Sequence, residues 1–319
     1  MFIIHKYLGV GMKSSVVSLA FLSAVAVGGI AGDASAMECP IKKSPPPPSK
    51  PWKAAHLVAQ ISHTDEKRLD EKNADQKLPI ASITKMMTAY LVIEKIKKGE
   101  MSPADRIKVS KESLCLPDSD FAVTPLPDNI TDISVEDALT QLILLSSNPM
   151  ADNLAVAVAG NKKEFVAQMN AQAKEWGMTS THFVNAHGLP IGNRKSEHTT
   201  ANDLLKMAQA LMPMVDDYKH YESRPLEVDG RSLNKEIKPW KREFVESGIL
   251  FKTATITGCH SLFTIDQQGQ SALVTIQLCG QRGTLASTVK GWMEKAKDFY
   301  VVQAATTEES PPLNPPSVP

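Results

Sequence analysis

The sequence predicts an α+β fold in which the first and last parts of the chain share one sheet. A short, mostly apolar run at 57–61 is typical of a buried strand. Segments with helical periodicity fill the middle of the chain, and two β-rich runs follow late, at 261–265 and 272–278. The polar residues 266–270 between those runs suit a hairpin turn, so the two late strands are expected to pair.

The helices are predicted from spacing and from capping residues. Apolar side chains recur at helical spacing through 82–98, and Gly99 is expected to end that helix. Two Ser/Thr and Asp pairs, three residues apart, resemble capping boxes that open helices. The further predicted helices, the capped ones included, cover 134–145, 161–176, 200–211 and 285–301.

The two ends of the chain differ in composition from its middle. Lysines precede an apolar run at 16–30, and the small residues Ala34, Ser35 and Ala36 follow, which is typical of a secretory signal peptide. An uncleaved anchor helix is the alternative, but the run is shorter than the ~20 residues of a membrane span. We expect export to the periplasm or cell envelope after cleavage near Ala36. The expected organisation is a signal peptide at 1–36, a proline-rich linker at 37–53, a single catalytic domain at 54–304 and a disordered proline-rich tail at 305–319.

Charge and metal-ligand patterns exclude several classes of function. Lys plus Arg and Asp plus Glu number 35 each, so the net charge of zero gives no indication of nucleic-acid binding and predicts at most weak membrane association. The four cysteines lack CxxC spacing and the eight histidines form no HExxH pair. We therefore predict no metal and no other cofactor.

Ser82 and Lys85 carry the first indication of chemistry. On a helix, residues three apart lie on one face, so a hydroxyl and an amine become neighbours. A serine hydroxyl needs a base within hydrogen-bonding distance before it can attack an amide. Lysine can be that base only if the pKa of its amine falls by roughly three units from ~10.4, which burial beside a second cation would favour.

Two further triplets follow in order: Ser146-Ser147-Asn148 after an apolar helix, and Lys252-Thr253-Ala254 entering the late strands. Each has a plain structural alternative, a helix end followed by a cap for the first and a surface charge on an edge strand for the second. Their joint occurrence after an S-x-x-K segment favours the catalytic interpretation.

These elements resemble the S-x-x-K, S-x-N and K-T-G boxes of penicillin-binding proteins and serine β-lactamases. The segments 79–89 and 177–190 are similar to those of the low-molecular-mass penicillin-binding proteins, the serine-type D-alanyl-D-alanine carboxypeptidase and endopeptidase family. Residues 73–75 and 200–203 are further similarities, and together the matches cover most of 54–302. The resemblance implies a serine β-lactamase/DD-peptidase-like fold: an antiparallel sheet with flanking helices and a mainly helical subdomain.

The resemblance also implies an acyl-enzyme mechanism on peptidoglycan stem peptides, with covalent inhibition by β-lactam antibiotics. Ser82 would attack the carbonyl of a D-Ala peptide after Lys85 accepts its proton, and Ser146 would relay a proton to the leaving amine. Removal of a terminal D-Ala and cleavage of a D-Ala crosslink both remain open. The short segment after residue 302 leads us to expect a form similar to the endopeptidase branch.

Substrate-binding residues are implied in the same way. Asn148 would hold the substrate amide, and Lys252 with Thr253 would bind its terminal carboxylate through charge-assisted hydrogen bonds. The backbone N–H groups of Ser82 and Thr255 are the candidates for the oxyanion hole.

The sequence departs from the family pattern at three places. Ala254 stands where the third box has glycine, and its added methyl group could narrow the cleft or displace the ligand. The link from Ala254 to Cys259 is short, and Asn202 stands where the family often has arginine. Cys259 and Cys279 lie at nearly mirrored distances from the hairpin turn, so they could form a cross-strand disulfide or, with a slip of one residue, lie on opposite faces.

Three alternatives are weighed against a peptidase that uses Ser82. A β-lactamase of class A needs a glutamate in an E-x-x-L-N segment, and the two Leu-Asn pairs at 233–234 and 313–314 lack it. A non-catalytic wall-binding protein is the second alternative, because of Ala254. A triad built on His182 or His187 is disfavoured, since the serine already has Lys85, and both histidines are expected to bond loop backbone.

Overall fold

The computed structural model describes a defined part of the chain, namely residues 51–62, 65–116, 130–190, 197–225, 227–228, 231–232, 239–281 and 283–294. The predicted signal peptide and C-terminal tail lie outside these ranges, as do residues 37–50 of the predicted linker. Those predictions therefore stay predictions. Among the described residues, no helix combines the length and apolarity that a membrane span requires.

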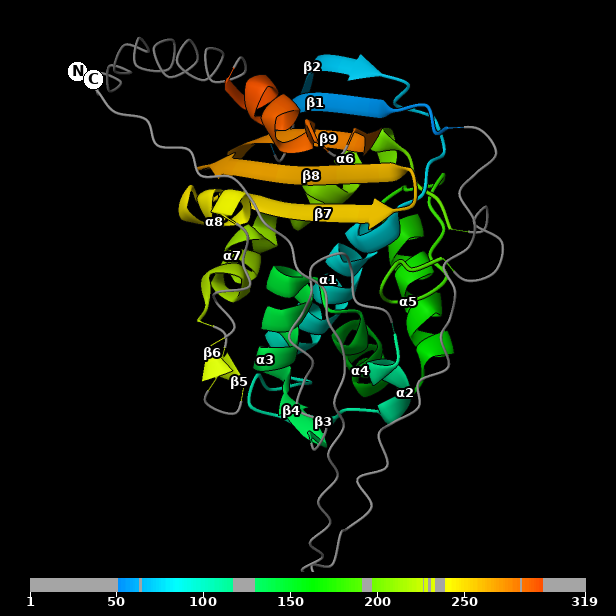
Figure 1. Cartoon of the computed structure of the whole chain (residues 1–319), viewed down its shortest axis with the longest axis vertical. Helices are drawn as coiled ribbons and strands as arrows, with labels where there is room; N and C mark the ends of the chain where they lie inside the picture. Colours follow the sequence, from blue (N-terminus) through cyan, green and yellow to red (C-terminus); the bar gives the residue numbers. More distant parts are fainter. Residues whose placement is uncertain are drawn as a thin grey trace, which may run out of the picture. The chain divides into compact units, whose positions relative to one another are not determined.

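Five antiparallel strands form the main sheet in the order β2-β1-β9-β8-β7 (Figure 1). The strand from the start of the domain, β1, pairs with the last strand, β9, so the two ends of the domain share a sheet as the sequence predicted. The strands are β1 (Ala55–Ser62), β2 (Glu66–Lys72), β7 (Leu250–Ile256), β8 (Cys259–Gln268) and β9 (Ser271–Gly280).

The hairpin between β8 and β9 is tighter than the predicted loop at 266–270. Strand β8 continues to Gln268 and pairs there with Ser271, so only Gly269 and Gln270 make the turn. Gly269 has a φ of +62°, the conformation that two-residue hairpin turns require. The predicted hairpin is confirmed, but its predicted loop is too long, because a polar sequence was interpreted as a loop although Asp266 pairs with Leu273 in the strand ladder.

The two faces of the sheet pack against different helices (Figure 1). Val58 and Phe251 face one apolar cluster, which includes Val289 from the last described helix, 285–294. Leu57 and Phe263 face the larger core on the opposite side, to which α6 (Ala201–Leu211) contributes. The period-two alternation of the strands thus produces a helix, sheet, helix layering.

The helical part of the domain contains the predicted helices, with the predicted caps at Ser134 and Thr200 and a further cap at Asn161 that was not predicted. Ser134, Asn161 and Thr200 each accept a hydrogen bond from the backbone N–H three residues later. The helix that follows Ser134 ends in a π-helical segment. The elements are η1 (Ala81–Ile83), α1 (Thr84–Lys97), α2 (Lys111–Leu114), α3 (Val135–Thr140), π-helical η2 (Gln141–Leu145), α4 (Asn148–Ala159), α5 (Lys162–Glu175), η3 (Met212–Met214), α7 (Val215–Ser223) and α8 (Pro239–Glu246).

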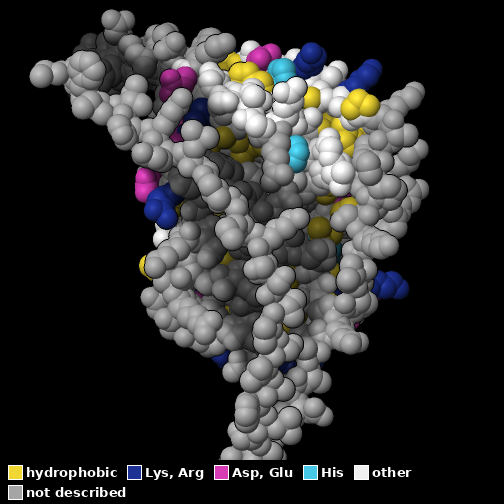
Figure 2. Space-filling model, viewed as in Figure 1, with side chains coloured by type: hydrophobic (Ala, Val, Ile, Leu, Met, Phe, Trp, Pro, Cys, Tyr) yellow, Lys and Arg dark blue, Asp and Glu magenta, His cyan; other side chains and the backbone are white. Residues whose placement is uncertain are grey.

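Two small sheets complete the described fold. One pairs β3 (Arg106–Lys108) with β4 (Asp132–Ser134), and the other pairs β5 (Glu227–Val228) with β6 (Arg231–Ser232). On the face seen in Figure 2, the charged side chains of the described residues are scattered and do not gather into a patch of one sign.

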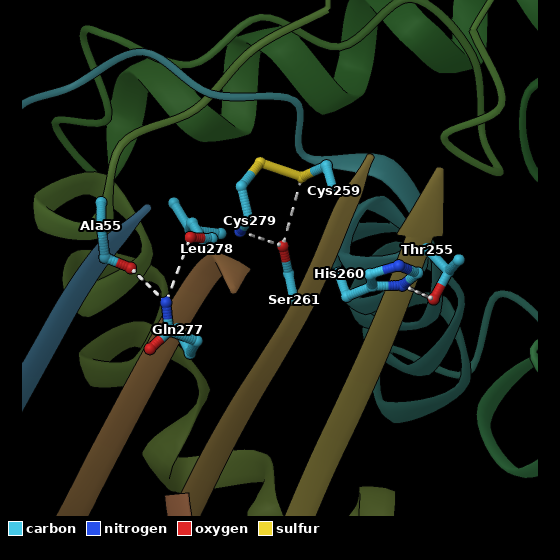
Figure 3. Close-up of a disulfide and its surroundings, with 8 residues drawn as sticks. All are labelled: Ala55, Thr255, Cys259, His260, Ser261, Gln277, Leu278 and Cys279. Carbon is cyan, nitrogen blue, oxygen red and sulfur yellow. Dashed lines mark hydrogen bonds between the residues drawn. A yellow bond between two sulfur atoms is a disulfide. The ribbon is translucent and has the colours of Figure 1, made fainter. Parts of the chain in front are cut away.

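Cys259 and Cys279 form a disulfide between β8 and β9, with their Cα atoms 4.0 Å apart (Figure 3). A β-bulge between His260 and Leu262 shifts the register at this point, and Cys279 has a φ of +52°. In a regular ladder, the register of β8 and β9 would place the two cysteines on opposite faces of the sheet. The bulge adds one residue to β9, which changes the register by one and brings both cysteines to the same face. Ser261 accepts a hydrogen bond from the Cys279 N–H at 3.1 Å.

We expect the double variant Cys259→Ala, Cys279→Ala to lose about 3 kcal/mol of unfolding free energy, because the bond closes a loop across a sequence separation of 20 residues. Urea unfolding followed by circular dichroism measures this. The double variant is preferable to a reductant, since Cys115 is also disulfide-bonded. An unchanged unfolding free energy would show that the bond contributes nothing to stability.

Candidate active site

Ser82 and Lys85 lie at the junction of η1 and α1, beneath β7. The Lys85 Nζ donates to Ser82 Oγ at 3.0 Å, and both side chains are buried. Ser82 belongs to a single 3-10 turn, and Lys85 lies in the first turn of the α-helix that follows. A hydroxyl and an amine in this arrangement can exchange a proton directly.

Lys85 has a second acceptor in the loop that contains His187. Its Nζ donates to the His187 carbonyl oxygen at 2.7 Å. The His187 ring accepts from the Leu189 N–H at 3.0 Å through Nδ1, so the imidazole bonds loop backbone. Sequence reasoning missed the His187 carbonyl, because a backbone acceptor has no residue signature.

The same loop touches the residue before the serine. Gly188 has a φ of +82°, and a Cβ at this position would lie 1.9 Å from the Ala81 carbonyl oxygen. Ala81 itself has a φ of +47°. The Asn185 side chain holds the loop by accepting from the His187 and Gly188 N–H groups. The backbone that presents Ser82 therefore depends on the absence of a side chain at position 188.

Ser146 and Asn148 flank the boundary between η2 and α4. Ser146 has a φ of +62°, and Ser147 caps α4 by accepting from the Met150 N–H. The helix cap is thus made by the middle residue of the triplet. Within the described part of the chain, the buried Ser146 Oγ has no hydrogen-bond partner. A buried hydroxyl in that state is expected where a substrate group completes its bonding.

Lys252 lies on the edge strand β7, yet it is only 2% exposed, which excludes the surface-charge interpretation. Leu250 and Ala254, two residues to either side, belong to the larger core, so Lys252 faces the layer that contains α1. Burial, then the positive charges of Lys85 and Lys241, hold the pKa of Lys252 well below its usual range. The lysine amines of the first and third boxes are therefore close enough to interact.

Thr253 and Thr255 lie on the other face of the same strand. Thr253 is buried, and Thr255 Oγ1 lies 3.2 Å from His260 Nδ1 across the β7–β8 hairpin (Figure 3). Among the described strands, β7 pairs only with β8, which leaves its second backbone edge for an extended ligand. Ala254 is 3% exposed and packs into the core.

Glu197 is a buried acid near the serine and the lysine that sequence reasoning did not single out. Its Oε1 accepts from Thr84 Oγ1 at 3.0 Å, on the first turn of α1. Burial raises the pKa of Glu197 to about 8, although the Thr84 hydrogen bond and the charge of Lys85 oppose the rise. A lone glutamate in a polar loop gives no sequence signal of burial.

Glu222 on α7 and Lys241 on α8 are two further buried ionisable residues that the sequence did not indicate. They are 3% and 4% exposed. Burial raises the pKa of Glu222 to about 8, while Lys252, Lys241 and a hydrogen bond from the Phe251 backbone oppose the rise. The Glu222 carboxyl group thus lies against β7, the strand that carries Lys252.

A family model described as D-alanyl-D-alanine carboxypeptidase, Peptidase S11, matches residues 44–259, a range that contains all three boxes. The chain belongs to the D-alanyl-D-alanine carboxypeptidase family. Among curated relatives of this family, the carboxypeptidase DacC of Escherichia coli K12 is 29% identical over 226 residues. That match covers 68% of this chain and 54% of DacC, so the chain spans about half the length of this relative.

Other similar proteins differ in how much of their length is matched. The D-alanyl-D-alanine endopeptidase of E. coli K12 is 26% identical over 277 residues, with 81% of this chain and 83% of the endopeptidase covered. Among solved structures, penicillin-binding protein D2 of Listeria monocytogenes, bound to ampicillin, has a TM-score of 0.61 and 26% identity, and the match covers 76% of this chain and 96% of that one. The predicted fold is confirmed by this likeness.

One departure from the family pattern has a structural counterpart. Asn202, which stands where the carboxypeptidase family often has arginine, donates through Nδ2 to Asp75 Oδ1 at 2.5 Å. Its backbone N–H donates to the Ala74 carbonyl oxygen. Asn202 therefore ties the start of α6 to the segment that precedes the serine.

Proposed function

We propose that this chain is a serine-type D-alanyl-D-alanine peptidase that acts on peptidoglycan stem peptides through an acyl-enzyme. The observation that carries the proposal is the buried hydrogen bond from Lys85 Nζ to Ser82 Oγ, with the amine of Lys252 close by. The family membership supports it. Export to the periplasm or cell envelope, where these peptides occur, is part of the proposal.

The proposed acylation step follows from these contacts. Lys85, in its neutral form, accepts the Ser82 proton while the serine oxygen bonds to the carbonyl carbon of a D-Ala residue. The backbone N–H groups of Ser82 and Thr255 would stabilise the oxyanion. Ser146 would relay this proton from Lys85 to the departing amine by accepting one proton as it donates another, which leaves Ser82 acylated and Lys85 neutral again. Attack by water then releases the product and restores the hydroxyl.

Substrate binding is assigned to residues of β7 and to the start of α4. Lys252 would bind the terminal carboxylate, because an ammonium supplies charge-assisted donors. The Thr253 side chain lies on the other face of β7, so its hydroxyl is not assigned to this carboxylate. Asn148, fully buried at the start of α4, would hold the substrate amide. β-Lactams carry a carboxylate and a reactive amide, and the related D2 protein is solved with ampicillin bound. We infer that penicillins acylate Ser82.

Labelling with a fluorescent penicillin tests this function. The wild-type chain should be marked covalently and Ser82→Ala should not, because the nucleophile is gone. The exposed Ser247→Ala variant is the matched control and should be labelled like the wild type. Absence of label on the wild type would favour the non-catalytic wall-binding alternative that Ala254 suggests. Rapid loss of the label by hydrolysis would favour a β-lactamase.

A second candidate activity is cleavage of D-Ala crosslinks. It is supported by the endopeptidase match, which covers 83% of that relative against 54% of DacC. Purified protein is incubated separately with a monomeric pentapeptide and with a crosslinked dimer, and the products are separated by mass. Release of monomers from the dimer without loss of D-Ala from the pentapeptide would identify an endopeptidase, and the reverse result a carboxypeptidase.

A further inference from the structure

Three buried ionisable side chains lie on α7, α8 and β7, three elements that pack against one another. Glu222 comes from α7, Lys241 from α8 and Lys252 from β7, and each is less than 5% exposed. The Phe251 backbone donates a hydrogen bond to the Glu222 carboxylate, and Lys241 Nζ lies 6.0 Å from the centre of the Phe251 ring. The backbone N–H of Phe251 therefore holds the Glu222 carboxyl group at the strand that carries Lys252, within range of electrostatic interaction with its amine.

Lys252 needs a positive charge for its proposed role, but its surroundings oppose that charge. Burial and two neighbouring lysines, Lys85 on α1 and Lys241 on α8, favour the neutral amine. Among the described residues, Glu222 is the acidic group that favours the ammonium form of Lys252. The other charged group that faces Glu222 is Lys219, one turn earlier on α7.

We propose that Glu222 is a positioning residue that keeps Lys252 cationic for recognition of the substrate carboxylate. The inference rests on the proposed function, in which Lys252 binds that carboxylate. With the acid present, the first proton that the cluster loses as the pH rises can come from the Glu222 carboxyl group, which leaves both lysines charged. When Glu222 is replaced by glutamine, the first proton that the cluster loses must come from Lys241 or Lys252, because the amide does not titrate.

The test compares pH profiles of penicillin acylation. In Glu222→Gln, the decline of the second-order acylation rate on the alkaline side should move to lower pH, with a loss of about 10- to 100-fold at pH 8 and a smaller loss at pH 6. For a peptide substrate, the loss should appear mainly in KM, since carboxylate binding is affected and the Ser82–Lys85 pair is not. Glu222→Asp, which keeps the charge, should restore part of the rate.

Lys241→Gln gives the opposite change and is informative even if Glu222→Gln fails to fold. Removal of this cation should move the alkaline decline to higher pH. The double variant Glu222→Gln, Lys241→Gln removes one charge of each sign and should return the decline close to its wild-type position. Lys219→Gln, on the same helix as Glu222, is the control and should move the decline little.

A uniform drop in rate with an unshifted pH profile in Glu222→Gln, or no shift in Lys241→Gln, would overturn the inference and leave Glu222 a purely structural residue. The failure of the proposed function is distinct, because it would appear as an unlabelled wild type or a labelled Ser82→Ala. Thermal unfolding of each variant establishes that the compared proteins are folded.

Discussion

Gly188→Ala is expected to abolish penicillin labelling and to lower the unfolding free energy by about 4 kcal/mol or more, a loss at the upper end of single substitutions. The added Cβ would lie 1.9 Å from the Ala81 carbonyl oxygen, 2.3 Å from its carbon and 2.9 Å from Thr84 Oγ1. Two of these atoms are backbone, so no side-chain rotation relieves the overlap. Either the loop or the turn that presents Ser82 must move.

Both displacements would damage the proposed site. Movement of the loop takes the His187 carbonyl away from Lys85 Nζ, and movement of the turn shifts Ser82 relative to Lys85. Gly160→Ala is the matched control, since Gly160 has a similar φ of +77° and open space where its Cβ would be. It should cost only about 1 kcal/mol for the left-handed conformation and should keep full labelling. Labelled, stable Gly188→Ala protein would show that the close approach is not needed.

Periodicity and capping residues predicted part of the fold, but the helices α4, α7 and α8 were not predicted. The strand at 57–61, the paired late strands and the capped helices follow from local patterns that tertiary packing then reinforces. Strand β2 was missed because its sequence, EKRLDEK, has only the half-buried Leu69 as an apolar residue. Such an edge strand is held by its backbone pairing with β1, and that pairing leaves no hydrophobic pattern in the sequence.

The site residues that belong to short sequence motifs could be predicted from the sequence. The residues that matter only because folding buries them could not. The three boxes stand out because hydroxyl, amine and amide groups recur at short spacings. Glu197, Glu222 and Lys241 are ordinary charged residues in sequence. Their importance arises when distant segments enclose them, and the sequence alone does not show which charged residues become buried.

Glu197→Gln is expected to remove much of the pH dependence of stability between about pH 4.5 and pH 8. Burial raises the pKa of Glu197 in the folded protein from 4.5 to about 8. Between these values, the unfolded chain has released the proton and the folded protein has kept it. The folded state therefore loses stability as the pH rises, and the full cost is reached above pH 8.

The variant should thus match the wild type at pH 4.5 and exceed its unfolding free energy by up to about 4 kcal/mol at pH 8, as measured by urea unfolding across this range. Glu222 has the same direction of pKa change, but it is present in both proteins and cancels in the difference. Exposed Glu246→Gln controls for the loss of a surface carboxylate. The unfolding free energy changes with pH wherever the folded and unfolded states bind different numbers of protons. A difference in unfolding free energy between variant and wild type that stays constant from pH 4.5 to pH 8 would therefore show that Glu197 has the same protonation in both states over this range.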